Sequence, residues 1–193
     1  FGHPQVGATH DYVVTGGNYR MSEFVAAVLR VQLSRVNELI DRRIENAAHL
    51  ARRLGDVPGL YPYVLDERIT RCNYLSYSLN YNADELAGVH RDVFLRALTA
   101  EGITLRTGYR TLVHESPLCN GENLREVDQR RFTGRNIAAA KKGRFPNAEH
   151  ARSNTTIRMP QSWLLGDRGV VDDVVRAVHK VVEHIGALTG EQL

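Results

Sequence analysis

The residues best suited to chemistry lie in one short segment that leads into a helix. Asn18 and Arg20 follow the glycine pair Gly16-Gly17 and precede Ser22. Glycines permit backbone angles that are closed to other residues and let the main chain approach a ligand closely. An amide and a guanidinium both suit phosphate oxygens. The segment therefore predicts an anion-binding turn, although a plain Gly-Gly turn with Ser22 as the helix N-cap explains the same residues.

A long helix is expected to follow this turn. Between Ser22 and Leu54, apolar residues recur at spacings of three and four, without an internal glycine or proline. This pattern predicts one amphipathic helix, on the order of 50 Å long at a rise of about 1.5 Å per residue. Gly55 and Pro58-Gly59 are expected to end it. Its apolar positions include Phe24, Val28, Val31, Val36, Leu39, Ile40, Ile44, Ala47, Leu50, Ala51 and Leu54.

The remaining chain alternates between shorter strands and helices. Alternating or β-rich runs predict strands, and spacings of three and four predict helices. Such alternation is typical of an α/β or α+β domain, a small sheet packed with helices. Strands are predicted at 74–81, 103–105 and 155–159, helices at 83–100 and 167–185, and single helical turns at 136–142 and 147–152.

Composition narrows the function classes. The chain has 193 residues, 42% hydrophobic and 24% charged, as in ordinary globular proteins. Its net charge is only +3, and its arginines are scattered among acids rather than gathered in a stripe, which argues against nucleic-acid binding. No apolar run approaches the length that crosses a membrane. Cys72 and Cys119 have no metal-site spacing and are compatible with a reducing cytoplasm, the localisation we expect.

Taken together, the motifs resemble the DegT/DnrJ/EryC1/StrS aminotransferases, over nearly the whole chain. The resemblance starts with Gly-Gly-Asn-Tyr-Arg-Met-Ser-Glu-Phe at 16–24 and is carried by the order of weaker motifs behind it. A departure is Val25, where the family usually carries glutamine. The further motifs are Ala26-Ala27, Gln32-Leu33, Arg42-Arg43-x-x-Asn46-Ala47, Glu101-Gly102-Ile103, Gly108-Tyr109, Ser116-Pro117-Leu118, Pro146-x-Ala148-Glu149-x-Ala151 and Leu164-Leu165-Gly166.

The resemblance implies a fold-type I enzyme that uses pyridoxal 5′-phosphate (PLP) and works as a homodimer with shared active sites. In the family, the asparagine that matches Asn18 reaches across the dimer to the phosphate of the partner's PLP. Arg20 is expected to serve that phosphate or a substrate carboxylate; a salt bridge to an acid near the helix start is the alternative. No metal, nucleic acid or membrane is expected to take part.

The substrate side rests on a closer resemblance. Gly108-Tyr109 followed by Pro117-Leu118 is most similar to the branch of glutamine:scyllo-inosose aminotransferases and aminohydroxybenzoate synthases. This implies transfer of an amino group from glutamine or glutamate to a keto-sugar or keto-cyclitol, in natural-product or aminosugar biosynthesis. Tyr109 and His114 are the expected substrate-binding residues; simple packing for Tyr109 and plain exposure for His114 are the alternatives. Arg106 and Arg110 suit either an anionic substrate or mere solvation.

One part of the family's machinery is expected outside this sequence. The family's Schiff-base lysine lies upstream of the Gly-Asn motif, and none of Lys141, Lys142 and Lys180 is framed as a buried amine. We therefore expect the C-terminal portion of a longer enzyme, inactive alone. Its expected parts are an active-site edge at 1–21, a linking helix at 22–55 and a small domain at 56–193. The alternative is a truncated, inactive homologue that serves as a dimerisation or interaction module.

Overall fold

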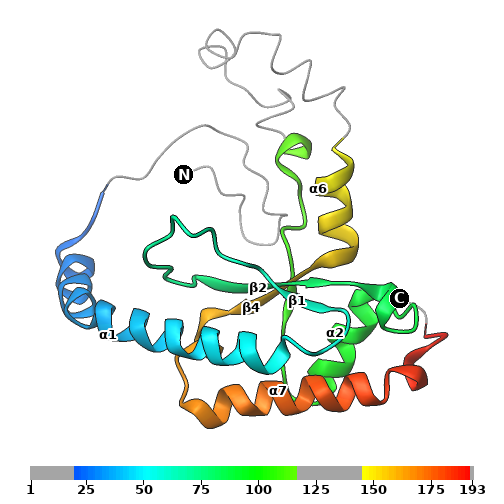
Figure 1. Ribbon diagram of the computed structural model, residues 1–193. Helices are drawn as coiled ribbons and strands as arrows, with labels where there is room; N and C mark the ends of the chain where they lie inside the picture. The colour runs from blue at the N-terminus through cyan, green and yellow to red at the C-terminus, as the bar shows by residue number, and fades with distance from the viewer. Residues whose placement is uncertain (1–19, 117–144, 192–193) are drawn as a thin grey trace, which may run out of the picture. The chain divides into compact units, whose positions relative to one another are not determined.

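The computed structural model describes residues 20–116 and 145–191, and these fall into two compact units (Figure 1). The first unit comprises residues 1–26 and 109–150, and the second comprises residues 27–108 and 151–193. In the described part of the chain, no helix is long and apolar enough to span a membrane. The three-part division expected from the sequence concerns the place of the chain in a longer enzyme and stays a prediction.

The second unit is built on a small antiparallel sheet. Its strand order is β1-β2-β4-β3, so β4, late in the chain, lies between β2 and β3. Residues that alternate along β2 and β4 are buried on one face only, because successive side chains of a strand point to opposite faces. The strands are β1 (Leu60–Pro62), β2 (Ser76–Tyr81), β3 (Arg106–Thr107) and β4 (Thr156–Pro160).

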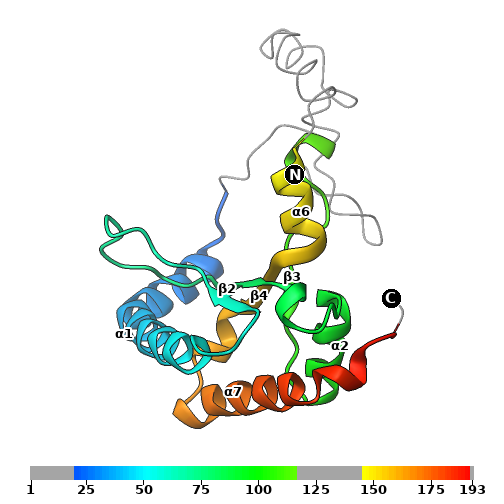
Figure 2. The ribbon, with the colours of Figure 1, turned by 45° about the vertical axis from the view of Figure 1, so that its right-hand side comes forward.

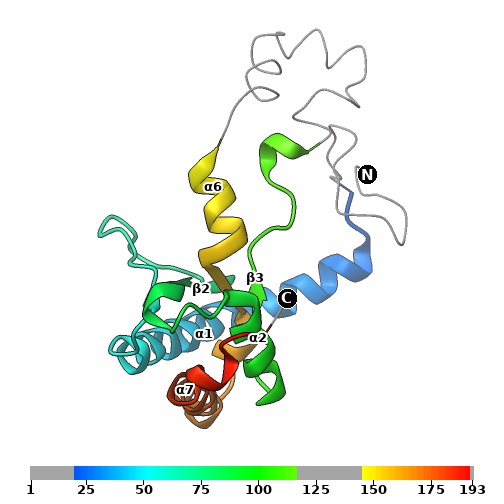
Figure 3. The same ribbon diagram turned by 90° about the vertical axis from the view of Figure 1, so that its right-hand side faces the viewer.

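Three helices cover the buried face of this sheet. They are α1 (Glu23–Leu54), α2 (Arg91–Ala100) and α7 (Arg168–Glu183), and all lie on one side of the strands in the three views (Figures 1, 2 and 3). The core between the layers is continuous. Its fully buried large side chains include Leu50, Leu54, Leu60, Tyr81, Leu86, Phe94, Leu98, Ile157, Met159, Leu164, Val171 and Val174. The small sheet packed with helices, as expected from the sequence, is thereby confirmed.

The last long helix, α7, is the element that the sequence describes best. Asp167 caps its start by accepting a hydrogen bond from Val170 N at 3.1 Å. Valines at helical spacing then bury one face against α2 and the sheet, as Val174 and Val178 do. The helix predicted at 167–185 is therefore confirmed, with ends within two residues of the expected ones.

The helix predicted at 83–100 is wrong in its first half. Residues Ala83–Glu85 form a single 3-10 turn, and α2 begins only at Arg91. Between them Ala87 and Gly88 have φ values of 53° and 72°, in the left-handed region that ends a helix. Tyr81 Oη then donates a hydrogen bond of 2.8 Å to Val89 O, which holds this connection against the core. The apolar residues keep their spacing of three and four across this break in the helix, so the sequence pattern alone predicted one continuous helix.

Two strands also differ from expectation. β1 has only three residues, too few for a visible alternation, so no strand was predicted there. β3 lies at Arg106–Thr107 instead of 103–105, because Ile103 and Leu105 are buried in the connection and only the next two residues pair with β4. The strands expected at 74–81 and 155–159 are confirmed as β2 and β4 with slightly shifted ends.

The helix α1 has two halves with different surroundings. From Arg43 onward its inner side is buried against the sheet, with Leu50 and Leu54 inaccessible to solvent. Two polar side chains pin this half to the turn before α7. The Asn46 amide donates to Leu164 O at 2.9 Å and to Gly166 O at 3.0 Å, and Arg43 donates to the Gln161 side-chain oxygen.

The first half of α1 exposes its apolar residues in this chain. Phe24 is 86% exposed and Leu33 is 70% exposed, although both belong to the helical apolar pattern or its flank. Met21, Val25, Val28, Leu29 and Val31 are exposed as well. A contiguous apolar surface of this kind usually marks an interface. The helix predicted over 22–54 is confirmed, but the other elements of this chain bury only its second half.

A pair of leucine substitutions within α1 tests this division. Leu50→Ala removes a buried side chain, so we expect the free energy of unfolding to fall by about 2–5 kcal/mol. Leu33→Ala makes the same chemical change at an exposed position of the same helix, and we expect a change within about 0.5 kcal/mol. Urea unfolding of the 193-residue chain at low concentration measures both. Equal losses for the two variants would contradict the burial of the second half alone.

The contact between α1 and α7 predicts a pH dependence. His49 Nε2 donates to Asp172 Oδ1 at 2.7 Å, and this hydrogen bond lowers the pKa of the Asp172 carboxyl below its ordinary value of 3.8. A lowered folded-state pKa stabilises the fold above the unfolded value, and this stabilisation is lost as the pH falls through the folded-state pKa. We therefore expect Asp172→Asn to lower the urea midpoint at pH 6, and the difference from the wild type to shrink as the pH falls below the ordinary carboxyl pKa of 3.8. Asp173→Asn, which removes an exposed partner of Arg176, is the control with little effect at either pH.

Candidate functional site

The predicted phosphate-binding segment ends at the start of α1. Arg20 is exposed and precedes the first helical residue, Glu23, by three positions. Ser22 caps the helix, since Val25 N donates to Ser22 Oγ at 3.4 Å and Ala26 N donates to Ser22 O at 2.9 Å. Asn18 lies outside the described residues. The N-cap that was one explanation of the segment is therefore present, and it does not compete with a ligand role for Arg20.

The chemistry of this end of α1 fits a phosphate group. A guanidinium offers paired N–H donors that match phosphate oxygens, and a helix N-terminus carries unpaired N–H groups with a partial positive charge. Glu23 in the first helical turn opposes this charge in part. Arg20 and the first turn of α1 are thus suited to the phosphate of a cofactor such as PLP, with Asn18 as the amide donor that the sequence adds.

Tyr109 stands at the start of a loop that follows β3. It is 76% exposed, so the packing role that was its alternative does not apply in this chain. The preceding Gly108 lies against β4, where an added Cβ would come within 3.4 Å of Thr156 Cγ2. Position 108 thus packs directly against β4, and the exposed phenol of Tyr109 follows it.

The His114 side chain is partly buried and contacts another ring. It lies in the 3-10 turn Val113–Glu115, and its ring is half-buried against Phe145, with centroids 4.4 Å apart and an angle of 32° between the planes. The turn is closed by Leu112 N, which donates to Glu115 Oε2 at 2.9 Å. The aromatic contact gives the imidazole a defined position, so plain exposure does not describe it.

The predicted site residues that the structure describes fall in one unit. Arg20, Tyr109 and His114 all belong to the first unit, although the sequence separates Arg20 from Tyr109 by the whole of α1, β1, β2, α2 and β3. The short helix α6 (Pro146–His150) belongs to the same unit and continues into a π-helical turn at Ala151–Thr155.

On the sheet, Arg106 was named from the sequence as suited to an anionic substrate or to mere solvation, whereas Arg158 was missed by sequence reasoning. Arg158 on β4 pairs directly with Arg106 on β3 and with Ser78 on β2. Arg158 alternates with the buried Ile157 and Met159, so it points to the face of the sheet that α1, α2 and α7 leave open. That alternation was visible in the predicted strand and was the signal that could have singled out Arg158.

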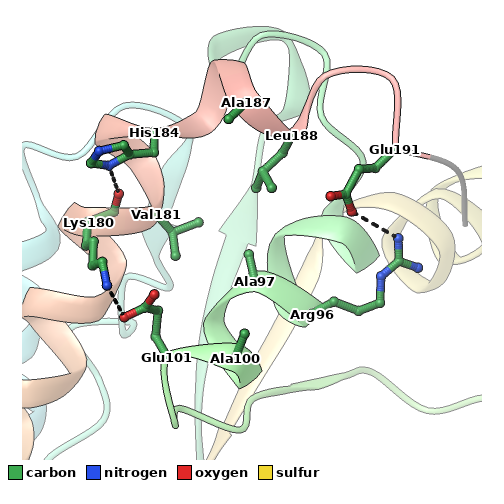
Figure 4. A pocket seen from close by; sticks show the side chains of 10 residues that line it. All are labelled: Arg96, Ala97, Ala100, Glu101, Lys180, Val181, His184, Ala187, Leu188 and Glu191. Atoms are coloured by element: carbon green, nitrogen blue, oxygen red, sulfur yellow. Dashed lines mark hydrogen bonds and ion pairs between the residues drawn. The ribbon is translucent and has the colours of Figure 1, made fainter.

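A surface pocket of about 460 Å³ lies elsewhere, between α2, the end of α7 and the 3-10 turn Ile185–Leu188 (Figure 4). Its floor is formed by small apolar residues such as Ala97 and Val181. Lys180 Nζ lies 2.7 Å from Glu101 Oε2, and Arg96 lies 3.8 Å from Glu191 Oε2, so these rim charges are paired with each other. None of the predicted site residues lines it.

The described residues offer no metal centre of the usual composition. Within 20–116 and 145–191, no group of three or more His, Cys, Asp or Glu side chains is arranged to hold a metal ion. Cys72 is a free thiol in the connection between β1 and β2. The predicted site residues that the structure describes offer a guanidinium, a phenol and an imidazole, those of Arg20, Tyr109 and His114.

Comparison of the sequence with known proteins agrees with this donor set. The model of the DegT/DnrJ/EryC1/StrS aminotransferase family matches residues 3–178. The L-glutamine:2-deoxy-scyllo-inosose aminotransferase of Streptomyces paromomycinus is 30% identical over 185 residues, 91% of this chain and 41% of that protein. The 3-amino-5-hydroxybenzoate synthase of Amycolatopsis mediterranei is 30% identical over 111 residues, 58% of this chain and 28% of that protein.

Solved structures show the same fold. Crystalline 3-amino-5-hydroxybenzoic acid synthase superposes with a TM-score of 0.65 at 22% identity, over 95% of this chain and 44% of that one. The aminotransferase from Psychrobacter cryohalolentis superposes with a TM-score of 0.64 at 20% identity, over 89% and 41% of the two chains. The chain spans about two fifths of the length of the relatives it matches. With its sequence matched from residue 3 to residue 178, this chain belongs to the DegT/DnrJ/EryC1/StrS aminotransferase family.

Proposed function

We propose that this chain is the C-terminal portion of a PLP-dependent aminotransferase that moves an amino group from glutamine or glutamate to a keto-cyclitol or keto-sugar. The observation that carries the proposal is the match along about 90% of the chain to proteins named as L-glutamine:scyllo-inosose and L-glutamine:2-deoxy-scyllo-inosose aminotransferases. PLP supplies the carbonyl that takes the amino group from one substrate and gives it to the other.

The lysine that such an enzyme needs is proposed to come from outside this chain. Lys180 is the one described lysine, and its ammonium is ion-paired with Glu101 on an exposed part of α7. A Schiff-base lysine needs a depressed pKa, which burial or a neighbouring cation provides, and an exposed ammonium beside a carboxylate has neither. Lys141 and Lys142 lie outside the described residues.

The residues of this chain would bind and orient the reactants. Asn18 and Arg20 would hold the cofactor phosphate at the start of α1, with Asn18 acting across the subunit boundary of a homodimer. Tyr109, exposed and directly after β3, would donate a hydrogen bond to a hydroxyl of the acceptor ring. His114, whose ring contacts Phe145, would contribute to binding of the same acceptor.

The exposed half of α1 supports the place of this chain within a larger assembly. Its apolar residues, among them Phe24 and Leu33, would be covered by the rest of the enzyme or by the partner subunit. At roughly 25 cal/mol per Å², leaving several hundred Å² of such surface in water forgoes several kcal/mol, which is comparable to the net stability of a domain. The proposed homodimer with shared active sites provides such cover.

Turnover by the full-length protein tests the proposal directly. The whole open reading frame that contains this chain, purified with PLP, is expected to convert scyllo-inosose or 2-deoxy-scyllo-inosose to its amino product with L-glutamine as donor. Product formation is measured by mass spectrometry, and the 193-residue chain alone, assayed in parallel, is expected to give none. A full-length protein that retains PLP but aminates no ketone from a panel of cyclitols and sugars would contradict the proposal and favour an inactive interaction module.

Loss of the Asn18 amide should weaken the hold on the cofactor. One hydrogen bond to a charged phosphate stabilises binding by about 1.5–3 kcal/mol, so Asn18→Ala in the full-length enzyme is expected to raise the Kd for PLP by roughly ten- to a hundred-fold. Equilibrium dialysis measures this Kd. Asn147→Ala, at an exposed asparagine of α6, is the matched control and should leave it unchanged. Activity regained by mixing Asn18→Ala subunits with lysine-dead subunits would support action across the dimer; an unchanged Kd would refute the assignment.

A further inference from the structure

Two buried side-chain hydroxyls in the described part of the chain have no hydrogen-bonding partner, those of Tyr77 and Ser116. Such atoms are rare in native proteins, because a buried polar group that loses its bonds to water is costly unless another partner replaces them. For Tyr77 the aromatic ring explains the burial. It lies on the buried face of β2 in the core, with its ring centroid 6.0 Å from that of Tyr74.

Ser116 has no apolar ring that would explain its burial. It is 9% exposed, and it is the only buried residue among the described residues of the first unit. Val113, three residues earlier in the same turn, is 79% exposed. Serines are mostly exposed in proteins, whereas valines are among the residues most often buried. This turn therefore buries a hydroxyl and exposes a valine, which the hydrophobic effect alone does not favour.

The backbone around Ser116 is closed by hydrogen bonds of its own. Ser116 N donates to Val113 O at 3.2 Å, and Glu115 N donates to Leu112 O at 2.9 Å. Leu112 N in turn donates to Glu115 Oε2 at 2.9 Å. These bonds hold the turn without using the Ser116 hydroxyl, which keeps both its donor and its acceptor capacity.

The surrounding sequence and the chemistry of the hydroxyl indicate what it could bind. Tyr109 and His114, which are proposed to bind the acceptor ring, belong to the same stretch of the first unit, residues 109–116. A serine hydroxyl is uncharged, and it both donates and accepts a hydrogen bond, as an alcohol group does. A buried carboxylate or phosphate is instead held best by a cationic partner. The Ser116 hydroxyl therefore matches a neutral polyol better than an anion.

We propose that Ser116 binds a ring hydroxyl of the acceptor and is a specificity-determining residue for the amination. This rests on the proposed function, because the acceptors named for the relatives are inososes, ketone rings that carry several hydroxyls. A ring with a hydroxyl at the right position pairs with Ser116. A ring without it leaves the buried serine unpaired, and such a site discriminates against that ring.

Removal of the hydroxyl in the full-length enzyme tests the assignment. Ser116→Ala is expected to raise the KM for the inosose that the wild type aminates best by about ten-fold, because a ring hydroxyl then loses its partner in a buried place. The KM for L-glutamine is expected to stay unchanged. The melting temperature should stay unchanged or rise, because the hydroxyl has no partner within the chain that would be lost. Tyr77→Phe is the matched control: it removes the other unpartnered hydroxyl, in the core, and should change neither KM.

Direct binding gives a readout that does not depend on turnover. Scyllo-inositol, a ring with an alcohol in place of the ketone, is titrated calorimetrically into the PLP-loaded wild type, Ser116→Ala and Tyr77→Phe. We expect binding about ten-fold weaker to Ser116→Ala and unchanged to Tyr77→Phe. A series of deoxy-inositols then identifies the partner, because the wild type and Ser116→Ala should bind equally to the one that lacks the hydroxyl held by Ser116.

The failing outcomes are separable. An active wild type whose KM for the ketone is unchanged in Ser116→Ala overturns the hydroxyl contact and leaves the proposed function intact, as if water alone paired with this serine. A variant that raises the KM for glutamine alone overturns the assignment to the acceptor. A lower melting temperature with unchanged binding of scyllo-inositol gives Ser116 a structural role and also overturns the proposal. A wild type that binds PLP and, through Ser116, scyllo-inositol but aminates nothing contradicts the proposed function and not the hydroxyl contact.

Discussion

Among the polar contacts that hold the second half of α1 to the rest of the second unit, the buried Asn46 amide makes two hydrogen bonds to one turn. Asn46 donates to Leu164 O and Gly166 O, two carbonyls of the turn that separates β4 from α7. A buried amide without partners would be costly, so these two bonds specify how α1 lies relative to that turn. Leu50 and Leu54 are fully buried in this arrangement, and α7 starts from the same turn at Asp167. The packing of α1 beside α7 on one face of the sheet therefore depends in part on this contact.

A consequence is that α1 extends beyond the layer it stabilises. A helix of 32 residues is anchored through its last twelve, from Arg43, and the remainder carries apolar residues away from the core of the second unit. Arg71 braces the middle of the helix by donating to Asn37 and pairing with Asp41. Ser22 caps the first turn of α1, and Arg20 lies directly before it, so the helix fixes the point at which the preceding segment begins.

The sequence predicted an element correctly where helix capping and the apolar spacing indicate the same structure. It did not predict features that depend on backbone conformation or on contacts between distant residues. The valine pattern and the Asp167 cap predicted α7, because burial and capping act within the helix itself. The same pattern failed at Ala87, whose left-handed backbone is set by its tertiary surroundings. Of the site, Arg20 was chosen from its guanidinium beside the glycine pair, and Tyr109 and His114 were chosen by resemblance. The ring contact of His114 with Phe145 had no local signal. Arg158 could have been found from the alternation of β4. Its pairing with Arg106 could not, because that depends on the register between two strands some fifty residues apart in the sequence.

The two faces of the sheet differ in burial and in polarity. On one face Tyr77, Leu79, Tyr81, Ile157 and Met159 are at most 4% exposed, and burial raises the pKa of the Tyr81 phenol to about 12, so this face carries no titrating group near neutral pH. On the other face the strands carry serine, threonine, asparagine and arginine side chains that contribute nothing to the core. Because alternation assigns every second residue to each face, substitutions at Arg106 or Ser78 can change the polar surface of the sheet without changing the packing beneath it.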